Sequence, residues 1–110
     1  VTSTVKRLSG GQRQAVAISR AVMWSNQFVI MDEPTAALGL RETAQVEELI
    51  RRIVDGGTSV LIISHNFEQV MRLSQQVWVM RAGRVVSGAR TADVTGAELV
   101  AQVTGANAFT

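Results

Sequence analysis

Apolar residues in this chain fall into short runs whose spacing predicts alternating helices and strands. The segment from Gly10 to Trp24 is apolar nearly all round, which predicts a largely buried helix. Continuous apolar runs at 28–31 and 60–63 are typical of strands buried in a parallel sheet. Between them, residues 41–55 repeat apolar side chains at helical spacing along one face. This alternation predicts an α/β domain whose ligands bind at the carboxyl ends of parallel strands.

Turn and capping residues predict how the rest of the chain is built. Asn66 has the side chain of an N-cap, so a short helix should begin after it. Apolar residues on both sides of Gly83 predict a hairpin whose turn places this glycine at positive φ. Thr95 and Glu98 have the spacing of a capping box, and Gly105 should end the helix that follows. The carboxyl-terminal part is therefore predicted to be a hairpin followed by a helix.

Composition narrows the chemistry that is possible. The 110 residues contain no cysteine and one histidine, which excludes disulfides, a cysteine nucleophile and a histidine-based metal cluster. No apolar run approaches the ~20 residues that span a bilayer. The net charge is +2 and no aromatic residues interleave the cationic ones of the opening stretch from Lys6 to Arg20, so nucleic acid is not an expected partner. One domain at most is expected, and a chain that begins at Val1 suggests part of a longer protein.

Acidic side chains stand where the first predicted strand ends. Asp32 and Glu33 follow that strand, and His65 follows the second strand. If the two strands are neighbours, these three side chains can converge on one point. On an extended segment the two carboxylates point to different sides, so one can hold hydrated Mg²⁺ while the other faces a water nucleophile. Phosphoryl transfer needs such a division, although a polar strand end and a structural histidine are alternative interpretations.

A second candidate site lies at the start of the first helix. Gly10 and Gly11 follow Ser9, and glycines in a first helical turn leave the backbone N–H groups uncovered. The helix dipole and the Ser9 hydroxyl favour an anion there. The alternative is a simple cap, in which Ser9 and Gln12 close a capping box without any ligand.

Four segments of the chain together resemble the ATPases of ABC transporters. Residues 8–14, Leu-Ser-Gly-Gly-Gln-Arg-Gln, are similar to the signature motif of that family. Residues 28–35 resemble its Walker B strand with the catalytic glutamate, and residues 36–39 stand where the D-loop belongs. Residues 63–65 resemble the switch-histidine loop. Because the four motifs occur in the family's order and spacing, the chain is identified as a member of the ABC ATPase family.

The resemblance implies a P-loop NTPase-type fold and a role for each strand-end residue. It implies that Glu33 polarises the water that attacks ATP, and that Asp32 supports Mg²⁺ through its water shell. It also implies that His65 contacts the γ-phosphate and links it to Glu33.

The resemblance also implies a role for the start of the first helix, where the two glycines stand. It implies that one subunit's signature residues bind the γ-phosphate of an ATP held by the opposite subunit, with Gln12 nearby. The residues that would do so are Ser9, Gly10 and Gly11.

The same resemblance implies the partners. A second nucleotide-binding domain would complete a head-to-tail dimer on transmembrane permease subunits, peripheral to the cytoplasmic side of the inner or plasma membrane. The amino-acid sequence of residues 34–39 and 64–66 most resembles that of monosaccharide importers. Such a protein would also work indirectly with a sugar-binding protein.

Two departures from the family pattern matter. Gly39 replaces the aspartate of the D-loop, which puts the usual communication between paired sites in question. The chain also has no Gly-Lys-Ser or Gly-Lys-Thr of a P-loop, and its one lysine is Lys6. Residues 1–110 therefore resemble the carboxyl-terminal part of one nucleotide-binding domain. We expect no meaningful ATPase activity from these residues alone, and an exposed apolar sheet edge that promotes aggregation.

Two other functions fit part of the pattern. The head of a DNA-repair or chromosome-organising ATPase would share the signature and Walker B motifs. A non-catalytic fragment that binds through the signature surface is the third hypothesis.

Overall fold

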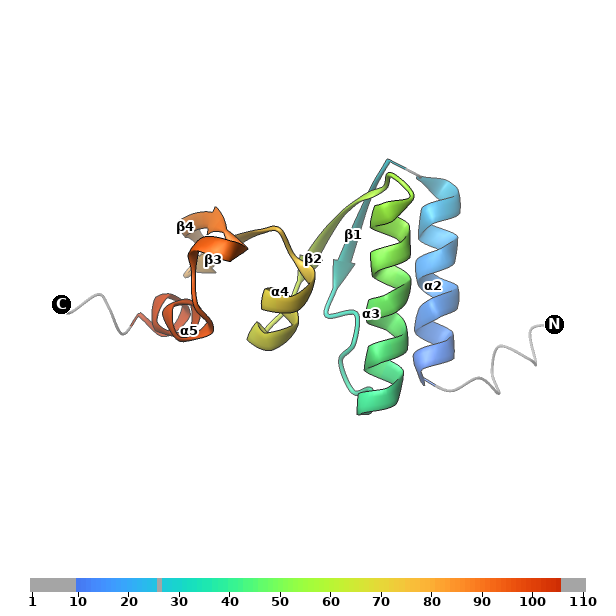
Figure 1. Ribbon diagram of the computed structural model, residues 1–110, viewed down its shortest axis with the longest axis horizontal. Coiled ribbons are helices and arrows are strands. Elements are labelled where there is room, and N and C mark those ends of the chain that lie inside the picture. The colour runs from blue at the N-terminus through green and yellow to red at the C-terminus, as the bar shows by residue number, and fades with distance from the viewer. Residues whose placement is uncertain (1–9, 26, 106–110) are drawn as a thin grey trace. The chain divides into compact units, whose positions relative to one another are not determined.

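The structure is a computed structural model that describes residues 10–25 and 27–105. The chain divides into two compact units, residues 1–64 and 65–110. In the first unit the order is α2 (Gly10–Trp24), β1 (Phe28–Asp32), α3 (Leu40–Asp55) and β2 (Ser59–Ile63), as labelled in Figure 1. These elements confirm the predicted helix and strand positions to within a residue at each end. The predicted approach segment, residues 1–8, and the Ser9 cap lie outside the described residues.

The first unit is built around a parallel pair of strands. β1 and β2 pair in register from Phe28 opposite Ser59 to Asp32 opposite Ile63. One further bond, from the Glu33 N–H to the Ile63 carbonyl oxygen at 2.7 Å, continues the pairing beyond the end of β1. The two strands are therefore neighbours, which was the condition set for a site at their carboxyl ends.

Among the described residues of this unit, helices cover only one face of the sheet. Val29 and Met31 are buried, because both α2 and α3 contact the strands on that side (Figure 1). The other face is apolar and open to solvent, with 44–60% of each side chain exposed at Phe28, Ile30, Leu61 and Ile63. The prediction that both strands are buried is therefore wrong for the described residues, because their helices lie on a single side. An open apolar face of this kind favours aggregation.

The helix α2 is also less buried than its composition predicts. Gly11 and Ile18 are its buried residues, whereas Trp24 is 91% exposed. Within the unit α2 packs against α3 and β1 along one side, which leaves Met23 exposed and Val16 half-buried. The prediction of a largely buried helix is therefore wrong for the part of the chain that is described.

α3 has the predicted single apolar face. Val46 and Ile50 are buried on it, and Glu47 lies beside them with 4% of its surface exposed, 3.9 Å from the Arg51 guanidinium. The helix ends before two glycines, the second of which, Gly57, has a φ of 103°. None of the described helices is both long and apolar enough to cross a membrane.

The second unit contains the predicted hairpin and two helices. Its order is α4 (Phe67–Leu73), β3 (Gln76–Arg81), β4 (Arg84–Arg90), a 3₁₀ turn at Thr91–Asp93, and α5 (Gly96–Thr104). β3 and β4 pair antiparallel, with a bulge opposite the step from Val79 to Met80.

Each predicted turn and cap of the second unit is present. Ala82 and Gly83 both have positive φ, 53° and 77°, as a two-residue hairpin turn of the primed type requires. The Asn66 side chain caps α4 by accepting a bond from the Gln69 N–H at 3.0 Å. Gly105 ends α5 in the left-handed conformation.

Candidate active site

The acidic pair lies at the carboxyl end of β1. Asp32 is the last strand residue and its side chain is exposed, whereas Glu33 is half-buried. The backbone of Glu33 has a φ of 49°, in the left-handed region that non-glycine residues rarely adopt. The prediction of an extended Asp–Glu segment is therefore wrong at Glu33, because the chain already turns at this residue. The bond to the Ile63 carbonyl holds this turn against the end of β2.

Two successive turns connect the acidic pair to α3. The Ala36 N–H donates to the Glu33 carbonyl at 3.1 Å, and the Leu38 N–H donates to the Thr35 carbonyl at 3.2 Å. Pro34, the second residue of the first turn, is fully buried. The two turns reverse the direction of the chain between β1 and α3. Residues 36–39, where the D-loop is expected, lie in this connection.

The glycine-led start of α2 lies against this connection and the first turn of α3. A methyl group added at Gly10 would meet the Leu38 side chain at 3.0 Å. The Gly11 N–H donates to the Glu42 carboxylate, Oε2, at 2.9 Å. The expectation that both glycine N–H groups are uncovered is therefore wrong for Gly11. Gln12 is exposed on α2, and Ser9 lies outside the described residues.

His65 begins the second unit, directly before the residue that caps α4. Its side chain is exposed, and it lines a groove of about 700 Å³ in that unit together with Glu68, Arg72, Met71 and Val100. The chain reaches His65 two residues after β2 ends. Its convergence with Asp32 and Glu33 stays a prediction.

The donor set suits a weakly held magnesium ion better than a dedicated metal centre. Among the described residues there is no group of three or more histidine, aspartate or glutamate side chains that could hold a metal. Mg²⁺ commonly keeps several waters and binds through one or two carboxylates plus substrate phosphates. The exposed Asp32 carboxylate at the strand end fits that mode.

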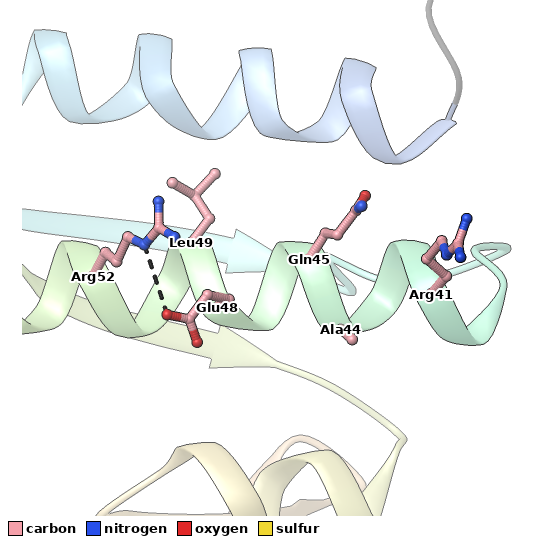
Figure 2. A pocket seen from close by; sticks show the side chains of 6 residues that line it. All are labelled: Arg41, Ala44, Gln45, Glu48, Leu49 and Arg52. Carbon is pink, nitrogen blue, oxygen red and sulfur yellow. Dashed lines mark ion pairs between the residues drawn. The ribbon is translucent and has the colours of Figure 1, made fainter.

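A separate groove of about 480 Å³ runs along α3, and no predicted site residue lies in it. Figure 2 shows its lining side chains and the ion pair between Arg52 and Glu48, whose charged atoms are 3.6 Å apart. Glu48 therefore carries a charge on the same helix as Glu42 without contributing to the candidate site.

Comparisons with known proteins agree with the motif pattern. Residues 1–36 match the family described as ABC transporter. The chain is 42% identical over 106 residues to the fructose import ATP-binding protein FrcA of Rhizobium meliloti, covering 96% of this chain and 41% of that protein. It is 44% identical over 86 residues to the xylose/arabinose import ATP-binding protein XylG of Sulfolobus acidocaldarius, covering 78% and 34%. A ribose import ATP-binding protein, RbsA of Yersinia pestis, is 40% identical over 92% of this chain and 20% of its own length.

Solved structures give the same fold. A nucleotide-free ATP-binding cassette from an ABC transporter superimposes with a TM-score of 0.72 at 27% identity, covering 90% of this chain and 37% of that one. The structure of cbiO1 from Clostridium perfringens, part of an ABC transporter complex, gives a TM-score of 0.74 at 28% identity, covering 87% and 39%.

The fold and the motifs define an ATP-binding cassette. The chain belongs to the ABC transporter ATP-binding family, and its sequence is close to monosaccharide import members. It spans between 20% and 41% of the length of these three relatives.

One residue of the site was missed by sequence reasoning. Glu42 contacts the signature glycine, but it is 31 residues away along the chain and belongs to no motif. Its only sequence signal is an acidic side chain in the first turn of a predicted helix, which is common wherever helices begin.

Proposed function

We propose that this chain supplies the signature helix, catalytic glutamate and switch histidine of an ATP-hydrolysing cassette in a monosaccharide importer. The parallel pairing that joins the Glu33 N–H to the Ile63 carbonyl at 2.7 Å carries the proposal. It ties the loop that bears the acidic pair to the strand that leads into His65, at the carboxyl ends of parallel strands where ligands of α/β folds bind.

In this proposal, the two carboxylates divide the work of phosphoryl transfer. Glu33 orients the attacking water and polarises it towards the γ-phosphorus. The exposed Asp32 would hold Mg²⁺ through its water shell, and the bound ion would neutralise phosphate charge. His65 donates a hydrogen bond to a γ-phosphate oxygen and links that phosphate to Glu33.

The start of α2 acts on a second copy of the cassette. Ser9, Gly10 and Gly11 bind the γ-phosphate of an ATP whose phosphate loop belongs to the opposite subunit, with Gln12 at the edge of the contact. A helix start with small residues suits an anion, because partial positive charge gathers there and the glycines carry no side chains of their own. ATP thereby closes a head-to-tail dimer, and hydrolysis reopens it.

The import relatives support the choice of partners. Fructose, xylose/arabinose and ribose import are the functions in their names. The cassette is therefore proposed to bind permease subunits at the cytoplasmic side of the membrane, and to serve a sugar-binding protein indirectly. Their likeness to this chain favours transport over the DNA-repair and chromosome-organising heads.

The test uses a complete cassette in which this chain replaces the matching residues of the fructose import relative. ATP hydrolysis is measured for that chimera, for its Glu33→Gln variant and for Glu48→Gln as the matched charge-removal control. We expect Glu33→Gln to lower kcat by about a hundredfold or more, since general-base assistance contributes about 10²–10⁴-fold. Glu48→Gln should stay within twofold.

The 110-residue chain without its complement is the negative control. It should hydrolyse no ATP, because it contains no P-loop lysine to hold the phosphates. Equal activity of the Glu33→Gln and Glu48→Gln cassettes would refute the proposal.

A further inference from the structure

The Glu42 carboxylate lies at the amino end of α2, where the signature glycines stand. Its Oε2 accepts the Gly11 N–H at 2.9 Å across 31 residues of sequence. Both residues stand in the first turn of their helices, Gly11 in α2 and Glu42 in α3. Figure 1 shows these two helices side by side with their amino ends together. The carboxylate therefore lies where the positive ends of two parallel helix dipoles meet, and both favour it.

The Glu42 side chain packs closely against Gly11, in the space that a side chain at residue 11 would need. A Cβ at Gly11 would lie 2.9 Å from the Glu42 Cβ and 3.2 Å from its Cγ. The stem of Glu42 thus fills the space that the glycine leaves, and its head group takes the glycine N–H. This is a fitted contact between two helices, which buries Gly11 and leaves Gly10 exposed.

The same N–H is the one that the proposed function gives to the γ-phosphate. One N–H hydrogen makes one good bond, and two anions within hydrogen-bond distance of the same amide repel each other. We propose that Glu42 is a positioning residue that sets the ATP requirement of the cassette, because its carboxylate holds the Gly11 N–H until the γ-phosphate displaces it. This inference rests on the proposed function of the signature residues.

Weakening the contact between Glu42 and Gly11 should have two opposite effects, one on ATP-driven dimerisation and one on thermal stability. Removing the charge with Glu42→Gln keeps the shape and an acceptor oxygen but weakens the hold on Gly11. Less ATP is then needed to close the dimer, while the helix pair becomes less stable to heat. A residue with a purely structural role would change both properties for the worse.

The experiment measures ATP-driven dimerisation of the complete cassette chimera. A Glu33→Gln background prevents ATP from being consumed, and dimer formation is followed by light scattering as ATP is titrated. Glu42→Gln and Glu42→Ala are compared with Glu48→Gln, which removes the same charge from α3 at a distance from Gly11. Ser9→Ala serves as the opposite control, because it removes a proposed phosphate ligand.

We expect both Glu42 variants to lower the ATP concentration at half-maximal dimerisation by about fivefold, the effect of weakening one charged hydrogen bond. Their melting temperatures should fall at the same time. Glu48→Gln should leave the ATP requirement unchanged, and Ser9→Ala should raise it.

Two results overturn the inference. If the parent cassette dimerises with ATP but the Glu42 variants match Glu48→Gln or need more ATP, the role of Glu42 is wrong and the proposed function stands. If the parent shows no ATP-dependent dimer and Ser9→Ala changes nothing, the proposed function fails, and the role of Glu42 fails with it.

Discussion

The helices α5 and α2 satisfy their first N–H groups in different ways. At α5 the Thr95 hydroxyl accepts the Glu98 N–H at 3.1 Å and contacts the Glu98 carboxylate at 3.2 Å, so the cap comes from within four residues. At α2 the Gly11 N–H is taken by Glu42, from another helix 31 residues away. One helix start depends on its own sequence, and the other depends on packing.

The difference separates two kinds of helix start. A local cap is present whenever the helix forms, because its donor and acceptor are held close by the chain itself. A remote cap exists only while α2 and α3 pack together, so it can be exchanged for another anion when the packing or the ligand changes. The start of α2, which we propose binds phosphate, is therefore the one whose cap is remote.

The largest effect should come from filling the space that the remote cap needs. Gly11→Ala puts a methyl group 2.9 Å from the Glu42 Cβ, an atom close to the backbone of α3. Overpacking by about 1–3 kcal/mol should exceed the helix-forming advantage of alanine, about 1 kcal/mol. We expect the free energy of unfolding of the cassette to fall by about 1–2 kcal/mol in denaturant titration.

Gly10→Ala is the matched control for that prediction. Its methyl group would meet the end of the Leu38 side chain at 3.0 Å, which can rotate away. We expect a change within about 0.5 kcal/mol. Equal destabilisation by the two alanines would contradict the fitted contact between Gly11 and Glu42.

An intermediate effect should come from removing the local cap. Thr95→Ala deletes the hydroxyl that accepts the Glu98 N–H, and such losses cost about 1 kcal/mol. Thr95→Ser keeps the hydroxyl and should lose much less. Chemical denaturation of the pair gives the difference, and ATP should not alter it. If ATP changed the cost of Thr95→Ala, the distinction between local and remote caps would not hold.

The smallest effect should come from the surface ion pairs of α3. Glu48 lies 3.6 Å from Arg52 and 3.8 Å from Arg51, with about half of its side chain exposed. Exposed pairs at this spacing stabilise helices by about 0.2–0.5 kcal/mol, and salt screens them. Glu48→Gln should therefore shift the melting temperature by about 1–2 °C at low salt and by less at 1 M salt. A larger shift that persists in high salt would show that Glu48 has a packing role.

Much of the fold could be predicted because its signals are local. The spacing of apolar residues predicted β1, α3 and β2, and the alternation of strands with helices predicted a parallel sheet. Gly83 was predicted correctly to have positive φ, because few other residues adopt that conformation at low cost, and Gly105 was predicted correctly to end a helix. Burial was predicted less well, since Ile30 and Trp24 are apolar yet exposed among the described residues. Apolar character alone does not say what covers a side chain.

The candidate site was predicted in part for the same reason. Asp32 and Glu33 were found because they end an apolar run, but the left-handed backbone of Glu33 was not, since glutamate has no preference for it. Glu42 was not found because no periodicity links residues 31 positions apart.

The sequence by itself determined the order of helices and strands, the local caps and turns, and the motifs of an ATP-binding cassette, because each depends on residues close together in the chain. Only the tertiary structure decided that α2 and α3 present their amino ends side by side with one carboxylate between them. That contact depends on how two helices pack, and packing brings together residues that no local pattern connects.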